Sequence, residues 1–349
     1  MTKISVGILG ATGTVGQRFI QLLAGHPWFE VAAVAASDRS AGKRYDKACH
    51  WLLPTEMPGA VGQLRVGALE PGLDCQLVFS ALPSSVAGPV EEHFARAGYV
   101  VCSNAAPFRL AEDVPLLIPE VNAEHTALID TQREGRRWTG LIVTSANCTT
   151  TQLALALKPL QDAFGLRKAS VVSMQALSGA GYPGVPSMDI LGNIVPFIGG
   201  EEEKVESEAL KLLGTLRDGR IVDSPLVVGA QCNRVPVKDG HTECVSLEFE
   251  RKAEPEEVVA ALDAFRGASV VSGLPSSPGQ PIVVRGEPDR PQPARDRDTG
   301  GGMSIVVGRV RPCPILDIKL VVLGHNTVRG AAGGSIHNAE LLVAQGWLE

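Results

Sequence analysis

Apolar runs and helical patterns alternate along the first part of the chain. Ile4–Leu9 is a short apolar run typical of a buried parallel strand, and Gln17–Leu23 follows with a helical pattern. Further strands are predicted at Phe29–Ala36, Cys75–Leu82, Tyr99–Cys102 and Leu141–Val143. Between two of them, Val90, Phe94 and Ala97 mark one face of a helix. This alternation is typical of an α/β sheet, where ligands gather at the strand ends.

The pattern is more mixed after residue 148. Lys168–Gln175 is predicted to be a strand and Glu201–Leu213 a helix, while Val245–Glu250 alternates as a half-buried antiparallel strand. A helix at Pro255–Leu262, strands near 303–310 and 316–322, and a last helix at 335–345 follow. The polar, proline-rich segment 286–302 is predicted to be a long loop, with a subunit contact as one role. No internal repeat is present, and the pattern indicates a second domain.

A glycine turn joins the first strand to the first helix. It reads Gly-Ala-Thr-Gly-Thr-Val-Gly, with glycines at 10, 13 and 16. Glycines at a strand–helix turn permit close approach of a pyrophosphate to the helix N-terminus. The spacing departs from GxGxxG, and a plain turn is the alternative, but the context favours a dinucleotide site. The expected contacts are Gly10, Thr12, Gly13, Thr14, Val15 and Gly16.

The second strand ends in Ser37-Asp-Arg-Ser40, where an adenosine ribose is read in such sheets. Asp38 could bind a 2′-hydroxyl, which would favour NAD. Arg39, with Ser37 and Ser40, could hold the 2′-phosphate of NADP. A solvated turn is the bland alternative. The basic and hydroxyl groups outnumber the single acid, so the sequence favours NADP.

Cys148 lies between the apolar run Leu141–Val143 and the helical pattern that starts at Leu153. A thiol near a helix N-terminus meets unpaired N–H groups and the positive end of the dipole, which lower its pKa. The same N–H groups could hold an oxyanion. A buried cysteine beside an ordinary helix cap is the equal alternative on this stretch alone.

Two further side chains could assist a cysteine nucleophile. His241 follows a predicted turn and could exchange protons near neutral pH, and Arg234 could clamp a carboxylate. Gln175 ends a predicted strand, where a structural hydrogen bond is the simpler explanation. Arg109 is a candidate anion binder, although by itself it suits a surface arginine. The acidic run that begins at Glu201 suits the first turn of a solvated helix.

Composition bounds the class of protein. With 349 residues, the chain suits about two domains. A net charge of -6 argues against nucleic acid as the main partner. Seven cysteines without a CxxC pair argue for free thiols in a reducing compartment, and against disulfides or a zinc site. No signal peptide or membrane span is expected, so a cytoplasmic protein without bound metal is predicted.

Several motifs in order resemble the aspartate-semialdehyde dehydrogenase family, in its archaeal and fungal-like branch. They are GATGTVG, ASDRSAGK, SANCTT, QALSGAG, GEEEK, CNRVPVKDGHTE, RPQPARDRDTGGGM and VVLGHNTVRGAAG. The resemblance spans nearly the whole chain. It implies a Rossmann NADP-binding domain from residues 1–147 and 326–349. It also implies an α+β catalytic and dimerisation domain, like the C-terminal domain of glyceraldehyde-3-phosphate dehydrogenase, from residues 148–325.

The resemblance also implies a reaction, a homodimer or homotetramer, and roles for residues. NADPH would reduce L-4-aspartyl phosphate to L-aspartate 4-semialdehyde with release of phosphate, toward lysine (through diaminopimelate), threonine and methionine. Cys148 would be the nucleophile and His241 the acid/base, with Asn147 and Gln175 orienting the acyl group. Substrate would be bound by Arg234 at its α-carboxylate, Glu201 at its α-amino group, and Arg109 and Lys204 at its phosphate. Cofactor contacts would extend to Ser80, Leu82, Ser178, Gly179 and Asn326.

Some alternatives stay open. Glu202 and Glu203 offer other registers for Glu201 and Lys204. A malonyl-CoA reductase-type enzyme would use the same nucleophile on a CoA thioester. N-acetyl-glutamyl-phosphate reductase fits the RVPVxxGH pattern less well. A binding protein that senses NADP would have no need of both Cys148 and His241.

Overall fold

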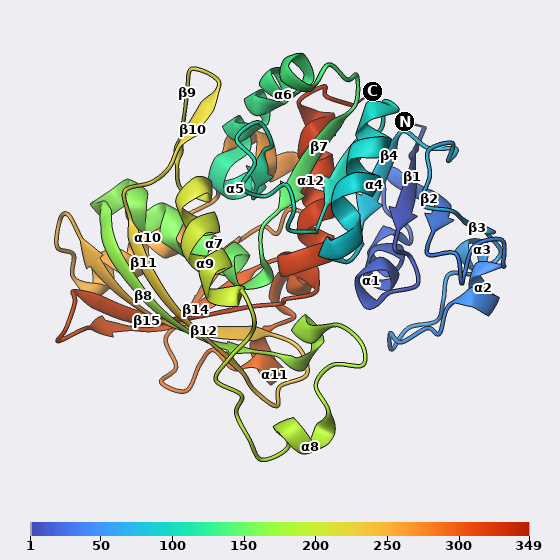
Figure 1. The fold of residues 1–349 in the computed structure, drawn as a ribbon. Helices are drawn as coiled ribbons and strands as arrows, with labels where there is room; N and C mark the ends of the chain where they lie inside the picture. The colour runs from blue at the N-terminus through green and yellow to red at the C-terminus, as the bar shows by residue number, and fades with distance from the viewer. Residues whose placement is uncertain (1, 349) are drawn as a thin grey trace.

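The computed structural model describes residues 2–348, which form two β-sheets with helices around them (Figure 1). The first sheet has seven parallel strands in the order β3-β2-β1-β4-β5-β7-β6. Its strands are β1 (Ile4–Leu9), β2 (Phe29–Ala35), β3 (Val66–Gly67), β4 (Leu77–Ser80), β5 (Val100–Ser103), β6 (Leu116–Leu117) and β7 (Leu141–Ser145). The predicted parallel α/β sheet is therefore present.

Helices cover both faces of this sheet, so its strands are apolar on both sides. Phe19 of α1 stacks on Phe79 of β4, and Phe94 of α4 packs into a separate cluster on the other face. The C-terminal helix α12 returns to contact β5 and β7, beside α1. The helices of this region are α1 (Thr14–Leu23), α2 (Tyr45–Ala48), α3 (Gly59–Gly62), α4 (Ser84–Arg96), α5 (Pro119–Asn122), α6 (Leu128–Arg136) and α12 (Gly333–Ala344).

The second sheet is mixed, with six strands in the order β11-β8-β12-β15-β14-β13. Its strands are β8 (Leu166–Gln175), β11 (Val227–Arg234), β12 (His241–Phe249), β13 (Ile282–Arg285), β14 (Ile305–Pro312) and β15 (Ile318–Gly324). A small hairpin, β9 (Thr215–Arg217) and β10 (Arg220–Val222), stands apart from it. The central strand β12 pairs antiparallel with both β8 and β15.

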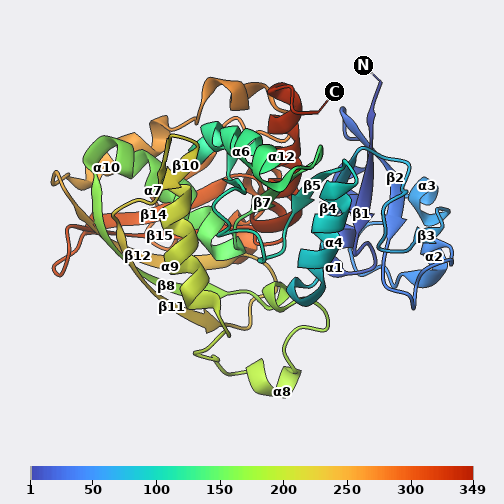
Figure 2. The same ribbon diagram turned by 45° about the horizontal axis from the view of Figure 1, so that its top comes forward.

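Three helices lie on one face of the second sheet (Figures 1 and 2): α7 (Cys148–Phe164), α9 (Glu201–Leu212) and α10 (Pro255–Ala264). The long α7 buries Leu153, Leu157 and Leu160 in the core that it shares with β8, β12 and β15. Short helices α8 (Ser187–Ile190) and α11 (Pro293–Asp296) lie in the connecting segments. The predicted loop 286–302 contains α11, and its buried Asp296 accepts hydrogen bonds from Arg290.

A buried ion pair joins the end of the chain to the first sheet. Arg329 lies in a π-helical turn, Val328–Ala332, between β15 and α12. Its guanidinium donates to both carboxylate oxygens of Glu120 on α5, at 2.7 and 2.5 Å. The paired charge lowers the pKa of Glu120 to about 2 despite its burial. Among residues 2–348, no helix is long and apolar enough to span a membrane.

Candidate active site

Cys148 is the first residue of α7. This helix begins shortly after β7, the strand of the first sheet that ends at Ser145. Asn147 caps the helix: its Oδ1 accepts hydrogen bonds from the backbone N–H groups of Thr149 and Thr150, at 2.9 and 3.2 Å. An asparagine at this position satisfies two of the free N–H groups of the first turn. The structure therefore confirms that Cys148 begins a helix.

His241 of β12 faces Cys148. The distance from Cys148 Sγ to His241 Nε2 is 3.2 Å, and the backbone N–H of Ala176 donates to Nδ1 at 3.0 Å. Because Nδ1 accepts, the neutral ring carries its proton on Nε2, towards the sulfur. Burial, followed by the charges of Arg234 and His325, lowers the pKa of His241 to about 3. The resting imidazole is neutral.

The thiol itself is not ionised in this geometry. Burial, and then the negative charge of Glu201, raise the pKa of Cys148 well above its usual value. Arg109, Arg234 and the N–H of Thr149 act in the opposite direction but do not outweigh burial. The expectation of a lowered pKa, drawn from the helix N-terminus alone, is therefore wrong for the unliganded protein.

Arg234 and Gln175 end two neighbouring strands, β11 and β8, and are paired in register. Both are buried. Arg234 Nη1 donates to the carbonyl oxygen of Ala176 at 2.7 Å, and Gln175 Nε2 donates to Ser173 Oγ at 3.3 Å. The loop after β8 crosses close above them, since a Cβ on Gly179 would lie 2.9 Å from Arg234 Nη1 and 3.0 Å from His241 Cε1. Any larger residue at position 179 would have to displace Arg234 or His241, and glycine needs no such shift.

Glu201 begins α9 and turns inward. Asn147 Nδ2 donates to Glu201 Oε1, and Lys204 Nζ lies 3.5 Å from Glu201 Oε2. Glu203 is exposed, and Glu202 accepts from a backbone N–H of β11. Glu201 is thus the residue of this run that meets Asn147. The default interpretation of a solvated face is wrong for it.

Arg109 is also buried, at 8% exposure, and is not the surface arginine that its local sequence suggests. Its Nη1 donates to Glu208 Oε1 at 2.9 Å, and Glu208 Oε2 accepts from the backbone N–H of Asn147 at 2.6 Å. Arg109 Nε is buried and has no hydrogen-bond partner among the described residues. Glu208 therefore ties this arginine to the residue preceding Cys148.

Sequence reasoning missed Glu208 and its neighbour Lys211. Both lie on α9, and Lys211 Nζ donates to three backbone carbonyl oxygens around the Arg109 loop, those of Arg109, Ala111 and Val114, at 2.7–2.8 Å. Glu208 follows Glu201 by seven residues, so the two lie on one face of the helix. This seven-residue spacing is the signal in the sequence from which Glu208 could have been predicted to face the site.

A cleft of about 530 Å³ opens between α1 and the second sheet. Three of the residues predicted to contact the cofactor line this cleft: Thr14 and Val15 of α1, and Ser178. Sequence reasoning missed other lining residues, among them Arg18, Lys238, Arg297 and His325. Asn326 connects the walls near this cleft, because its Nδ2 donates to Ser178 Oγ and its Oδ1 accepts from the N–H of Gly240, both at 2.8 Å.

The glycine turn has the shape of a phosphate cradle. Gly10 has a φ of +78°, and a Cβ on Gly16 would lie 2.4 Å from the carbonyl oxygen of Gly10. Gly13 caps α1 without a side-chain hydrogen bond, so no side chain competes for the N–H groups of the first turn. These residues fit a dinucleotide pyrophosphate.

The remaining predicted cofactor residues lie along the same edge of the first sheet. Ser80 ends β4, and Leu82 lies two residues further, 3.4 Å from where a Cβ of Gly10 would be. Thr12 lies in the glycine turn, where its carbonyl oxygen accepts from Gln17 Nε2. The turn that follows β2 exposes Ser37 and Arg39 and leaves Ser40 half-buried. They do not line the 530 Å³ cleft.

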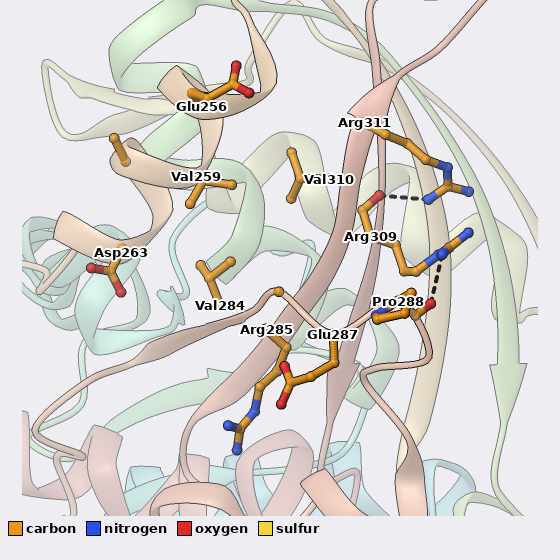
Figure 3. A pocket seen from close by; sticks show the side chains of 12 residues that line it. Glu256, Val259, Asp263, Val284, Arg285, Glu287, Pro288, Arg309, Val310 and Arg311 are labelled. Atoms are coloured by element: carbon orange, nitrogen blue, oxygen red, sulfur yellow. Dashed lines mark hydrogen bonds between the residues drawn. The ribbon is translucent and has the colours of Figure 1, made fainter.

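A larger cavity of about 620 Å³ lies elsewhere, between α10 and strands β13 and β14 (Figure 3). Three arginines and three acidic residues line it, and two of the arginines donate to backbone oxygens: Arg309 to Pro288 O, and Arg311 to Arg309 O. It contains none of the predicted site residues. Among residues 2–348, no cluster of three or more His, Cys, Asp or Glu side chains could hold a metal ion.

Comparison with protein families gives two matches that divide the chain. Residues 5–129 match the model for the NAD binding domain of semialdehyde dehydrogenases, and residues 157–329 match the model for their dimerisation domain. The first region contains the strands of the Rossmann-type sheet up to β6, β7 lies between the two regions, and the second region contains the whole mixed sheet. The fold and the cysteine site thus define a semialdehyde dehydrogenase.

Similar proteins cover the chain from end to end. Aspartate-semialdehyde dehydrogenase of Archaeoglobus fulgidus is 54% identical over 98% of this chain and 99% of its own length. That of Schizosaccharomyces pombe is 49% identical over 98% of both chains. The solved structure of the Candida albicans enzyme with NADP is 44% identical, with a TM-score of 0.92 over 99% of this chain and 100% of that one.

A more distant structure has the same fold. Aspartate-semialdehyde dehydrogenase II of Vibrio cholerae, complexed with ASA, is 28% identical, with a TM-score of 0.77 over 98% of this chain and 99% of that one. The chain belongs to the aspartate-semialdehyde dehydrogenase family.

The raised thiol pKa predicts a pH dependence. A cysteine reacts as its thiolate, so alkylation of Cys148 in the unliganded protein should rise about tenfold per pH unit from about pH 6 to about pH 9. Iodoacetamide labelling followed by peptide mass spectrometry measures this rate for each cysteine. A short unstructured peptide with one cysteine, labelled in the same reaction, serves as the reference. A Cys148 rate that levels off below about pH 7 would instead mean a resting thiolate.

Proposed function

We propose that this protein catalyses the NADPH-dependent reductive dephosphorylation of L-4-aspartyl phosphate to L-aspartate 4-semialdehyde, a step toward lysine, threonine and methionine. One observation carries the proposal. Cys148 lies 3.2 Å from His241, with Arg109, Arg234 and Glu201 close enough to act on its pKa. A nucleophile flanked by two cations and one acid suits an acyl phosphate that also bears an amino group and a carboxylate.

Each charged residue is proposed to bind a different group of the substrate. Arg234 binds the α-carboxylate and Glu201 the α-amino group, because a buried charge needs an opposite partner. Arg109 and Lys204 bind the phosphate, and the free Nε of Arg109 supports this role. Asn147 and Gln175 orient the acyl group beside Cys148.

Acylation begins with attack of Cys148 Sγ on the acyl carbon. The carbon–sulfur bond forms, the bond from the acyl carbon to the phosphate oxygen breaks, and the thiol proton leaves with the phosphate. His241, the proposed acid/base, acts through Nε2. Its proton can donate to the oxygen of the acyl group, where negative charge develops.

The thioester is the form that is reduced. The nicotinamide, when bound, supplies the hydride that converts the thioester to a thiohemiacetal. His241 Nε2–H then stabilises the oxygen of this intermediate, the carbon–sulfur bond breaks to release the aldehyde, and the Cys148 sulfur takes up one proton from solvent to regenerate the thiol. Ser178 lines the cofactor cleft and the adjacent Gly179 lies against Arg234 and His241, so the cleft and the catalytic pair meet at this loop.

NADP is held mainly by the first sheet. The glycine turn from Gly10 to Gly16 would hold the pyrophosphate, and Ser37, Arg39 and Ser40 would hold the 2′-phosphate. Ser80 and Leu82 flank the glycine turn. Ser178, Gly179 and Asn326 contact the nicotinamide end. The proposed cofactor domain is 1–147 with 326–349, and 148–325 is the catalytic and dimerisation domain, a division supported by the return of α12 to the first sheet.

The main alternative is reduction of a CoA thioester, as in malonyl-CoA reductase. A CoA thioester has no phosphate on the reacting carbon, so it leaves Arg109 Nε and Lys204 without a partner there.

The seven free cysteines suit a reducing compartment, and we propose a cytoplasmic location.

Two substitutions test the chemistry. Cys148→Ala should abolish oxidation of the semialdehyde, and His241→Asn should lower kcat by about 10²–10⁴-fold while NADPH binding is retained. The assay follows NADPH formation with phosphate and, separately, with CoA as the acyl acceptor. Normal turnover by Cys148→Ala would contradict the nucleophile, and turnover with CoA but not phosphate would favour the alternative.

Cofactor choice depends on Arg39. Arg39→Ala should raise the KM for NADP at least about tenfold and leave that for NAD nearly unchanged, since only NADP has the 2′-phosphate that a charged hydrogen bond would hold. Steady-state kinetics with both cofactors measure this. The matched control is Lys43→Ala, a nearby cation whose Nζ already donates to the backbone oxygen of residue 39. Equal losses for both cofactors would contradict the role.

We further propose that the uncovered face of the second sheet joins two copies of the chain, as a dimerisation domain requires. Val172, Cys244 and Val321 lie side by side across β8, β12 and β15. Their alternate neighbours Val171 and Val245 point into the core under α7. Val172 is 39% exposed in the single chain. An apolar row at the centre of an open sheet face suits burial against another copy.

This surface predicts a change in assembly. Val172→Lys should shift a homodimer or homotetramer towards a smaller species, because two-fold symmetry brings like charges together. Light scattering after gel filtration measures the mass. The matched control is Val222→Lys, a valine 50% exposed on the β9–β10 hairpin. An unchanged mass for Val172→Lys would place the interface elsewhere.

A further inference from the structure

A second pair of contacting side chains, Gln152 and Glu243, lies next to the Cys148–His241 pair on the same helix and strand. Gln152 follows Cys148 by one turn of α7, and Glu243 follows His241 by two residues of β12. Gln152 Nε2 donates to the carbonyl oxygen of His241 at 3.0 Å and to Glu243 Oε1 at 2.6 Å. Four helical residues advance about 6 Å and two strand residues about 7 Å. Gln152 therefore lies opposite Glu243 much as Cys148 lies opposite His241.

The space for Gln152 is built into the sheet. Gly324 of β15 is the register partner of His241. A Cβ on Gly324 would lie 2.2 Å from Gln152 Oε1. Any other residue at this position would push Gln152, and with it the contact to the His241 carbonyl oxygen, out of place.

Glu243 has no cation to balance a negative charge. Its side chain is fully buried, no ion pair to it exists among the described residues, and its Oε2 has no hydrogen-bond partner there. The buried Glu120 shows the contrast, since Arg329 pairs with both of its oxygens. A buried carboxylate without such a partner keeps its proton.

We propose that Gln152 and Glu243 are positioning residues for the reaction: Gln152 fixes the backbone of His241 so that Nε2 stays against Cys148 Sγ, and Glu243 holds Gln152 as a neutral, protonated acid. The inference deepens the proposed function and rests on it for the kinetic readouts. Burial raises the pKa of Glu243 to about 8, which agrees with a protonated group at neutral pH.

Three variants separate positioning from packing. Glu243→Gln keeps the shape of the neutral acid and should retain kcat within about threefold. Glu243→Ala and Gln152→Leu should each lower kcat at least about tenfold, because small displacements of catalytic groups are costly. The KM for NADP should stay within about twofold in all three, since neither residue contacts the cleft.

The matched control lies on the same helix. Gln161 donates to the carbonyl oxygen of Leu213, away from His241. Gln161→Leu replaces a glutamine of α7 by leucine, like Gln152→Leu, but removes its contacts with Leu213 and Ser224 instead, and should leave kcat unchanged. A Glu243→Gln enzyme as slow as Glu243→Ala would overturn the neutral acid. Full kcat in folded Glu243→Ala and Gln152→Leu would overturn the positioning role.

A stability measurement tests the protonation state without turnover. The folded chain keeps a proton on Glu243 that the unfolded chain releases above its ordinary pKa of 4.5. This contribution to stability is therefore largest at low pH and is lost as pH rises from 4.5 to about 8. The Tm of the natural protein should fall relative to that of Glu243→Gln across this window. A constant Tm difference would overturn the proposal.

These readouts also separate the two proposals. Absence of any semialdehyde oxidation by the natural protein would defeat the proposed function alone. Thermal unfolding, and the iodoacetamide rate of Cys148 in Gln152→Leu, would still decide the positioning role. We expect that rate to change at least about threefold when the His241 contact is released, and an unchanged rate would count against it.

Discussion

The packing of α7 against β12 is the constraint on which the site depends. Cys148 follows the first sheet directly, whereas His241 belongs to the second, so the 3.2 Å contact exists only where this helix crosses between them. Leu153, Leu157 and Leu160 bury α7 on the second sheet. The apolar core thereby sets the distance between the two reacting side chains, because close-packed interiors leave little freedom to shift.

Two ion pairs lie around this contact, Arg109 with Glu208 and Lys204 with Glu201, and they decide which charges are left for a ligand. Glu208 balances Arg109 and also accepts from the N–H of Asn147, which leaves Arg109 Nε for an anion. Cys148 receives no such compensation, and its thiol stays protonated in the unliganded protein. The site is thus arranged so that an anionic substrate completes its electrostatics, since ion pairs in a low dielectric are strong only when both partners are present.

Local pattern was sufficient for the elements that carry the chemistry. The structure confirms strand β1 at Ile4–Leu9 and places Cys148 at the start of α7, because periodicity and capping residues act within a few positions. Burial of Arg109 was not predictable in this way, since its partner Glu208 lies 99 residues away. Gln152 and Glu243 escaped notice for the same reason: their contact spans 91 residues. The predicted direction of the Cys148 pKa shift was wrong, because the shift is dominated by desolvation, which depends on the tertiary packing around the thiol.

The end of the chain completes the site that its middle begins. After β15, Asn326 links Ser178 to Gly240, and the π-helical turn brings Gly330 against the nucleophile, where a Cβ would lie 2.8 Å from Cys148 Cβ. The buried Arg329–Glu120 pair fixes this turn before α12 returns to the first sheet. Neither sheet with its own helices contains a whole site. The cofactor cleft and Cys148 therefore lie next to each other only when the C-terminal segment is packed against the first sheet. The packing of the two domains is in this way part of the catalytic geometry.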